Sequence, residues 1–208
     1  MIPLDPENSA TRDDLLQRVA LMEAMIAEGR QSTARFGWIF VLWGVVELAG
    51  MVWQAKWSYS DWLWPTTIAC GFVLQYLGFA LHRNRGVARP TNLKARSVGA
   101  AWSMMGLAAT LYSFAAIFHH DAWQVSFFAG IFMLVGLAHA TSAMILRWAA
   151  QGFVAAIWWA GGLAAFFVPR EYDLILFMVE MVFGMIGFGL YAMWLERRRL
   201  TAPVQHHA

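Results

Sequence analysis

The stretch WQVSFFAGIFMLVGLAHATS, residues 123–142, is twenty residues long and contains no Asp, Glu, Lys or Arg. A helix of about 20 mostly apolar residues crosses the hydrocarbon core of a bilayer, which is about 30 Å thick. Five further stretches of this kind occur in the chain, so the sequence predicts six membrane-spanning helices. The predicted spans are residues 36–53, 62–81, 97–118, 123–142, 149–168 and 173–195.

The apolar stretches are continuous, which predicts an all-α, polytopic membrane protein. A membrane β-barrel would instead alternate apolar and polar residues in segments of about ten. The composition agrees, with 60% hydrophobic and 13% charged residues among 208. A water-soluble chain of this composition would expose large apolar patches and aggregate.

Short internal similarities favour an organisation as three helical hairpins. Residues 102–109 read WSMMGLAA and residues 158–165 read WWAGGLAA, with a weaker copy at residues 40–45. Hairpins that each leave one membrane face and return to it would be parallel repeats, so the sequence suggests an internal triplication. Chance matches among Gly, Ala and Leu are the alternative, because these residues dominate membrane helices.

The distribution of Lys and Arg predicts that both termini are cytoplasmic, since cytoplasmic loops carry an excess of basic residues. With the N-terminus inside, only Lys56 and Arg170 of the fifteen Lys and Arg residues lie on the outer side. The expected location is a cell inner (plasma) membrane. The basic side faces anionic lipid, so the bilayer is the expected partner and nucleic acid is not.

Residues 1–34 form the expected cytoplasmic N-terminal segment, residues 35–196 the membrane bundle and residues 197–208 a cytoplasmic tail. Residues 11–34 are predicted to form an amphipathic helix, because Leu15, Val19, Met22 and Ile26 follow the 4-3-4 spacing of a helix seam. Such a helix could lie on the membrane, cover the bundle or bind a protein partner.

Few polar residues occur within the predicted spans, and two carboxylates are the most notable. Glu47 and Glu180 fall near mid-depth, where a charged group costs about 2.5–3.5 kcal/mol and usually faces a bundle interior. Burial disfavours their charged forms. Each could be a protonated, hydrogen-bonded structural residue or could handle a proton or cation. The candidate intramembrane polar site also includes Gln75, Thr110 and His139.

A second candidate cluster, of His119, His120 and Asp121, lies in one predicted outer loop. Nitrogen and oxygen donors of this kind would suit a divalent transition metal if the loops converged, and would otherwise simply be solvated. We expect no resident metal and no cofactor. The chain shows no nucleophile elbow, zinc-protease motif or phosphate-binding loop, so we expect no enzyme.

Two hypotheses of function follow from the sequence. The first is a non-enzymatic interaction module of the membrane, related to signalling or stress, whose partner binds the helix at residues 11–34. The alternative is a small permease or channel that handles protons, cations or a cationic solute through Glu47 and Glu180.

Overall fold

The computed structural model describes residues 6–57, 62–83, 93–118 and 127–201, and all regular elements in these ranges are helical. The elements are α1 (Pro6–Arg35), α2 (Gly37–Trp57), α3 (Leu63–Arg83), α4 (Leu93–Phe118), α5 (Phe127–Leu146), α6 (Ala149–Ala164), η2 (Arg170–Tyr172), α7 (Asp173–Glu180), η3 (Met181–Gly187) and α8 (Phe188–Thr201). The predicted all-α class is confirmed. Five helical segments are long and apolar enough to cross a membrane, and α6 is an apolar helix of sixteen residues.

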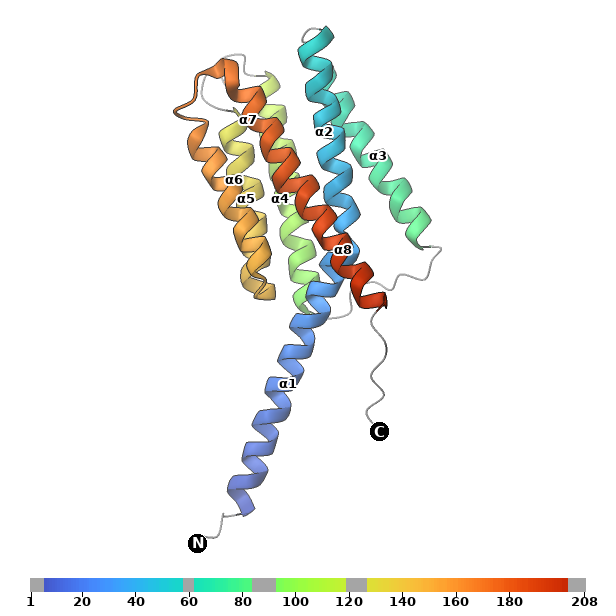
Figure 1. The fold of residues 1–208 in the computed structure, drawn as a ribbon, viewed down its shortest axis with the longest axis vertical. Helices are drawn as coiled ribbons and strands as arrows, with labels where there is room; N and C mark the ends of the chain where they lie inside the picture. Colours follow the sequence, from blue (N-terminus) through green and yellow to red (C-terminus); the bar gives the residue numbers. More distant parts are fainter. Residues whose placement is uncertain (1–5, 58–61, 84–92, 119–126, 202–208) are drawn as a thin grey trace.

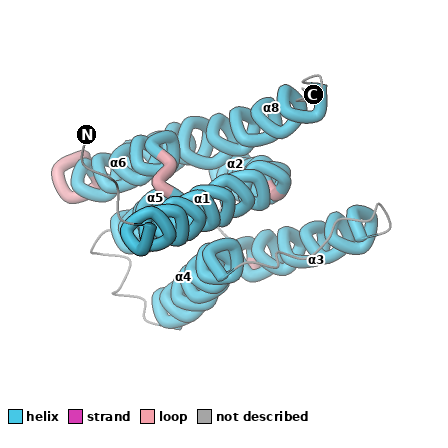
Figure 2. The backbone as a smooth tube through the Cα atoms, turned by 90° about the horizontal axis from the view of Figure 1, so that it is seen from below, coloured by secondary structure: helices cyan, strands magenta, loops and turns pink. Residues whose placement is uncertain are grey.

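The last three elements, α7, η3 and α8, run on without a break as one helix, here called the last helix (Figure 1). Seen from below, the helices form three rows, with α6 and α8 in the first, α5 and α2 in the second, and α4 and α3 in the third (Figure 2). The last helix packs along both α2 and α6, while α5 packs along α6 and α4. The first and the last spanning helices are therefore neighbours. The predicted triplication stays a prediction.

The buried core lies between the first two rows. It includes Phe132 of α5, Trp158 of α6, Phe177 of α7 and Phe188 of α8, whose rings pack with further buried side chains of α2. Helices α3 and α4 contribute little to it and instead expose large apolar side chains such as Phe72, Leu107 and Leu111. Outward apolar side chains are expected where lipid is the solvent.

Helix α1 continues almost directly into α2. The two helices are separated at Phe36, whose backbone N–H still bonds to Ser32 and Thr33. The apolar helical segment Asp14–Trp57 has 44 residues. At about 1.5 Å per residue this is about twice the length that a bilayer core requires. Part of α1 must therefore extend beyond the bundle, as Figure 1 shows.

The projecting part differs from the sequence-based expectation for residues 11–34. The helix begins at Pro6, five residues earlier, with proline in the first-turn position that it tolerates well. Residues 6–24, here called the arm, extend away from the bundle along the direction of α2 (Figure 1). All arm side chains that the structure describes are exposed. Covering of the bundle, one of the predicted roles, is therefore confined to the final turns of α1.

The base of the arm is held by Arg30. Its Nε donates a hydrogen bond of 2.7 Å to the carbonyl of Leu146, and its Nη2 donates to the carbonyl of Arg147. Helix α5 ends here with Arg147 in the left-handed region at φ 48°, and the N–H of Trp148 bonds to Ala143, as in a Schellman motif. Arg30 thus satisfies carbonyls that the end of α5 leaves without helical partners.

Candidate functional site

Glu180, at the end of α7, is 4% exposed and points toward α6. Its carboxyl group lies against Gly161, so closely that any side chain at residue 161 would collide with it. The carboxyl atom Oε2 is buried and has no hydrogen-bond partner among the described residues. A buried carboxyl group with an unsatisfied oxygen is unusual and calls for a functional or solvent-based explanation.

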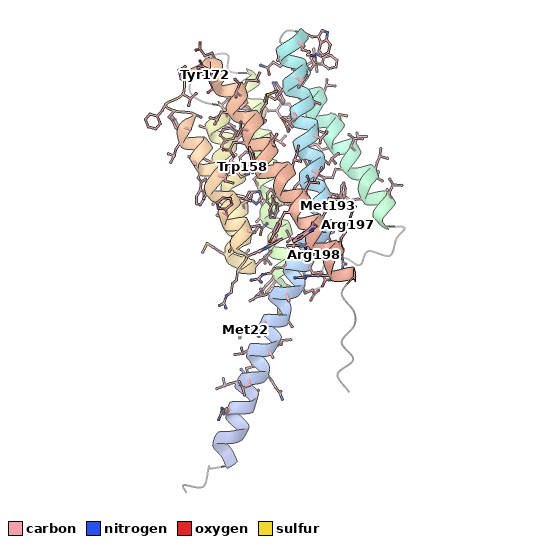
Figure 3. All side chains as sticks on the ribbon, viewed as in Figure 1. Met22, Trp158, Tyr172, Met193, Arg197 and Arg198 are labelled. Carbon is pink, nitrogen blue, oxygen red and sulfur yellow. The ribbon has the colours of Figure 1, made fainter. Side chains whose placement is uncertain are left out.

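Trp158 lies one helical turn from Gly161 on α6 and is fully buried. Figure 3 shows its position inside the bundle. The edge of its indole ring that carries Nε1 lies against Gly184, where a Cβ atom would again collide. Within the described part of the chain, Nε1 has no acceptor. Gly184 belongs to η3, a π-helical segment, and π-helical turns are frequent at functional sites.

His139 of α5 is fully buried in a cage of rings. The imidazole centroid lies 4.8 Å from that of Trp102, 5.1 Å from that of Phe188 and 5.6 Å from that of Phe40. Neither ring nitrogen has a hydrogen-bond partner in the residues that the structure describes. Because a neutral imidazole carries one donor and one acceptor, two hydrogen bonds are left unmade.

Ser142 and Gln151 lie nearer the arm and are both fully buried. The Ser142 hydroxyl accepts a hydrogen bond of 3.0 Å from Trp102 Nε1. Gln151 sits in the first turn of α6, and neither its amide oxygen nor its amide nitrogen has a partner in the described ranges. Burial of an amide without hydrogen-bond partners costs about 1–3 kcal/mol, so the burial of Gln151 also calls for a functional or solvent-based explanation.

These five buried side chains, at different levels of α5, α6 and α7, are here called the polar column: Glu180, Trp158, His139, Ser142 and Gln151. Their order along the bundle follows from the packing of the helices, because Gly136 of α5 lies against Trp159 and the Cβ of Trp158, while Gly161 of α6 lies against Glu180. His139 and Ser142 then follow Gly136 at intervals of one turn toward the arm. Three residues of an α-helix rise about 4.5 Å, so the levels of Gly136, His139 and Ser142 are about 4.5 Å apart along α5.

Phenylalanine side chains lie at the end of the polar column away from the arm. Phe177 is one turn beyond Glu180, and its ring centroid lies 5.0 Å from that of Phe128 and 5.6 Å from that of Phe132. Phe132 and Phe177 are almost fully buried. The column is thus bounded on this side by an apolar plug, here called the phenylalanine plug (Phe128, Phe132 and Phe177), while its other end lies two residues from the start of α6.

Of the predicted intramembrane site, His139 and Glu180 are the two residues that the structure buries almost fully. Gln75 accepts a hydrogen bond of 2.6 Å from Trp43 Nε1 between α2 and α3. Thr110 donates one of 2.8 Å to the carbonyl of Gly106 in its own helix. Both are thereby satisfied locally and lie outside the polar column.

Glu47 lies on the face of α2 that also holds Gly44 and Met51, and it is half-buried. Gly44 packs on Met185 and Ile186 of η3, so Glu47 is at about the depth of Glu180 in the antiparallel last helix. The carboxyl group of Glu180 points toward α6, however, and Glu47 belongs to α2, so a similar depth does not by itself place the two carboxyl groups in contact. The second predicted cluster, His119, His120 and Asp121, falls outside the described residues.

Sequence reasoning missed three members of the polar column. Gln151 and Ser142 lie within the predicted spans 149–168 and 123–142, but nothing in the sequence distinguishes them as a site. Trp158 is one of twelve tryptophans. The only signal in the sequence was that Gln151 places an amide within a predicted span. The lack of hydrogen-bond partners can be seen only when the helices are packed together.

Comparison of the chain with protein-family models, curated proteins and solved structures gives no match. The fold and the exposed apolar helices fit the class of multi-pass membrane proteins. Two features of this chain bear on its function, the arm and the polar column.

Proposed function

We propose that this protein is a non-enzymatic interaction module of the membrane, of the kind used in signalling or stress responses, whose arm receives an amphipathic helix of another protein. The observation that carries the proposal is the apolar row Leu15, Val19, Met22 and Ile26, here called the arm stripe, whose first three residues lie exposed on the arm. Leu15, Val19 and Met22 are each more than half exposed. Figure 3 shows Met22 on the projecting arm, well away from the bundle.

The arm stripe continues into a packed surface. The same alternation of three and four residues reaches Gly29 and then Thr33 further along α1, and both of these residues are buried. Gly29 packs closely on Leu146 of α5 and lies near Ala95 of α4. One face of α1 is therefore covered by helices at its base and uncovered along the arm. A further helix laid along the stripe would extend the same packing, in the manner of a helix-in-groove complex.

A second copy of this chain is a poor fit for the arm stripe. Two copies in one membrane would be related by a two-fold axis along the membrane normal, with their stripes facing each other. Each bundle lies on the stripe side of its own α1, so both bundles would compete for the same space. The proposed partner is a helix that ends at the bundle, with an apolar face and a basic residue opposite Glu23 at the border of the stripe.

Site-specific photo-crosslinking in cell membranes tests this proposal. A photoreactive residue at Val19, within the stripe, should yield one recurrent heterologous adduct. The same residue at Leu21 should not, although Leu21 is 64% exposed, because it faces away from the stripe. Adducts of the same mass from positions 15 and 22 would support the proposal. A dimer of this chain, or equal adducts from positions 19 and 21, would contradict it.

We infer further that the arm lies on the cytoplasmic side of a bacterial-type inner membrane. Support comes from the many basic residues expected on the arm side, among them Arg30, Lys94 and Arg147. A single cysteine placed in the arm of a Cys70→Ser variant provides the test. An impermeant thiol reagent should label it in inverted membrane vesicles and leave it unlabelled in intact cells.

The three-hairpin triplication also stays a proposal, supported by the similarity between residues 102–109 and 158–165.

Proton or cation handling is the second candidate function. The observation that favours it is the burial of Glu180 at 4% exposure in the polar column, where the polar atoms of Trp158, His139 and Gln151 also have no hydrogen-bond partner among the described residues. The sequence-based version of this function used Glu47 together with Glu180. A Glu47→Gln, Glu180→Gln double variant with unchanged uptake and an unchanged response to pH would rule that version out.

A further inference from the structure

We propose that the polar column is a one-sided proton path, in which bridging water molecules connect the arm side of the bundle to a proton-binding site at Glu180. The inference deepens the second candidate function and is independent of the arm stripe. Its starting point is the set of buried polar groups that have no partners among the described residues: Glu180 Oε2, Trp158 Nε1, both ring nitrogens of His139 and both amide atoms of Gln151.

Water is the simplest group that satisfies all of these atoms. A buried water typically makes about three hydrogen bonds to polar groups that otherwise have none. The levels of Gly136, His139 and Ser142 are about 4.5 Å apart along α5, a rise that two hydrogen bonds through one water molecule can bridge. The row contains both donors and acceptors, so each bridging water can be oriented along it. A chain of this kind can move protons without moving larger solutes.

The proton, rather than a metal cation, is the ligand that the arrangement favours. Metal sites require several ligands that converge on one point. The members of the column instead follow one another along the bundle, and no group of three or more His, Cys, Asp or Glu suited to a metal occurs within the part of the chain that is described. Trp158 presents only an N–H donor, which cannot ligate a cation but can bind a water or a carboxylate.

Access to Glu180 differs between the two ends of the column. On the arm side the row ends at Gln151, in the first turn of α6. On the opposite side the phenylalanine plug packs directly beyond Glu180. A proton from water on the arm side would pass along the bridging waters and bind to a carboxylate oxygen of Glu180, and it would leave by the same route. The path therefore loads a site and does not conduct across the membrane.

Few ionisable groups surround Glu180. Helix α6 carries none, His139 is the only one on α5, and α2 carries Glu47 and Lys56. The last helix adds Asp173 at its start, Tyr191 nearer the arm, and Glu196, Arg197, Arg198 and Arg199 at its far end, while Lys94, Arg96 and Tyr112 lie on α4 and η2 carries Arg170, Glu171 and Tyr172. Lys56 stands in the last turn of α2 and Arg170 precedes α7, and the basic groups of α4 and the last helix lie at the arm-side ends of those helices. Glu180 is thus placed to bind a proton rather than to form an ion pair, since charged groups in such surroundings are costly.

The test is infrared spectroscopy of the full-length protein in lipid vesicles with the arm outward, with the pH stepped on one side at a time. The carbonyl band of a protonated carboxyl group should appear on acidification of the arm side, and the Glu180→Gln variant should lose it. Acidification of the opposite side alone should produce no rapid change. If the band is absent at every pH, persists in Glu180→Gln or responds first to the opposite side, the proposal is wrong.

Matched variants test the path itself. Gln151→Leu and the milder Ser142→Ala remove polar groups from the column and should cause loss of the rapid phase of protonation, with the final band unchanged. Gln75→Leu and Thr110→Val remove polar groups that lie elsewhere in the membrane helices and should leave the rapid phase intact. Equal loss in both sets would show a general packing effect and overturn the path. Retention of the rapid phase in Gln151→Leu and Ser142→Ala would also overturn the path. Arm-stripe variants should not alter the band.

Discussion

The carboxyl group of Glu180 packs against Gly161 of the neighbouring helix, which leaves no room for a side chain at residue 161. The two residues lie in different helices and yet restrict each other. Glycine at residue 161 allows Glu180 to point into the bundle, and Gly184 does the same for Trp158. Close helix contacts through small residues are a general feature of membrane bundles. Here these contacts also determine where the buried polar groups lie.

Gly161→Ala is expected to destabilise the bundle by about 1–3 kcal/mol, because the added methyl group collides with Glu180. Thermal unfolding in detergent would measure the effect. Gly106→Ala is the control, since a Cβ atom at residue 106 meets no other atom within 4 Å. The double variant Gly161→Ala, Glu180→Ala should recover part of the loss. Additive effects of the two substitutions would contradict the contact.

Arg30→Ala is expected to destabilise the attachment of α1 by about 1.5–3 kcal/mol, the usual range for a hydrogen bond with a charged partner. Its Nε donates to the carbonyl of Leu146 at 2.7 Å. Arg18→Ala provides the comparison, because Arg18 pairs with Asp14 on the exposed arm and the pair contributes only about 0.5 kcal/mol. Equilibrium unfolding would rank the two variants. Equal effects would mean that Arg30 does not hold the base of the arm.

Removal of residues 1–24 should leave the bundle folded, because the described side chains of the arm are exposed. Removal of residues 1–35 should lower the unfolding temperature, since it also removes Arg30 and the buried Thr33 and Ala34. Size-exclusion chromatography and a thermal melt would compare the two truncated proteins. A large effect of the shorter deletion would show that the arm stabilises the bundle.

Gln75→Leu should weaken the packing of α3 on α2 by about 0.6 kcal/mol, the average for such hydrogen bonds within membranes. The substitution leaves Trp43 Nε1 without the acceptor that now lies 2.6 Å away. Disulfide trapping or a thermal melt would detect the change. Trp43→Phe removes the donor of the same hydrogen bond, and the double variant should lose less than the sum of the two single effects. Additive effects would point to packing volume instead.

The apolar stretches were sufficient to predict the all-α class and the approximate positions of the spanning helices. They also identified Glu180 and His139 as unusual polar residues, because any ionisable group in such a stretch is costly. The spacing of Leu15, Val19 and Met22 places these residues on one face of α1. These features could be predicted because each depends on residues that are close together in the chain.

The grouping of the polar residues could not be predicted in the same way. In a water-soluble protein the apolar face of a helix indicates the core, but a membrane helix is apolar toward both lipid and protein, so its pattern does not show which face is buried. Gln75 and Glu180 looked equivalent in the sequence, whereas one bonds to Trp43 and the other points at Gly161. The predicted set of Glu47, Glu180, Gln75, Thr110 and His139 therefore separated into different surroundings.

By itself, the sequence determined that the chain forms apolar helices long enough for a bilayer, since helix length and hydrophobicity are local properties. Only the tertiary structure decided that α6 packs between α5 and the last helix, and that Gln151, Ser142 and Trp158 are buried inside the bundle as His139 and Glu180 are. The physical reason is that the burial of these residues depends on contacts between helix faces. Close approach at Gly136, Gly161 and Gly184 sets those contacts.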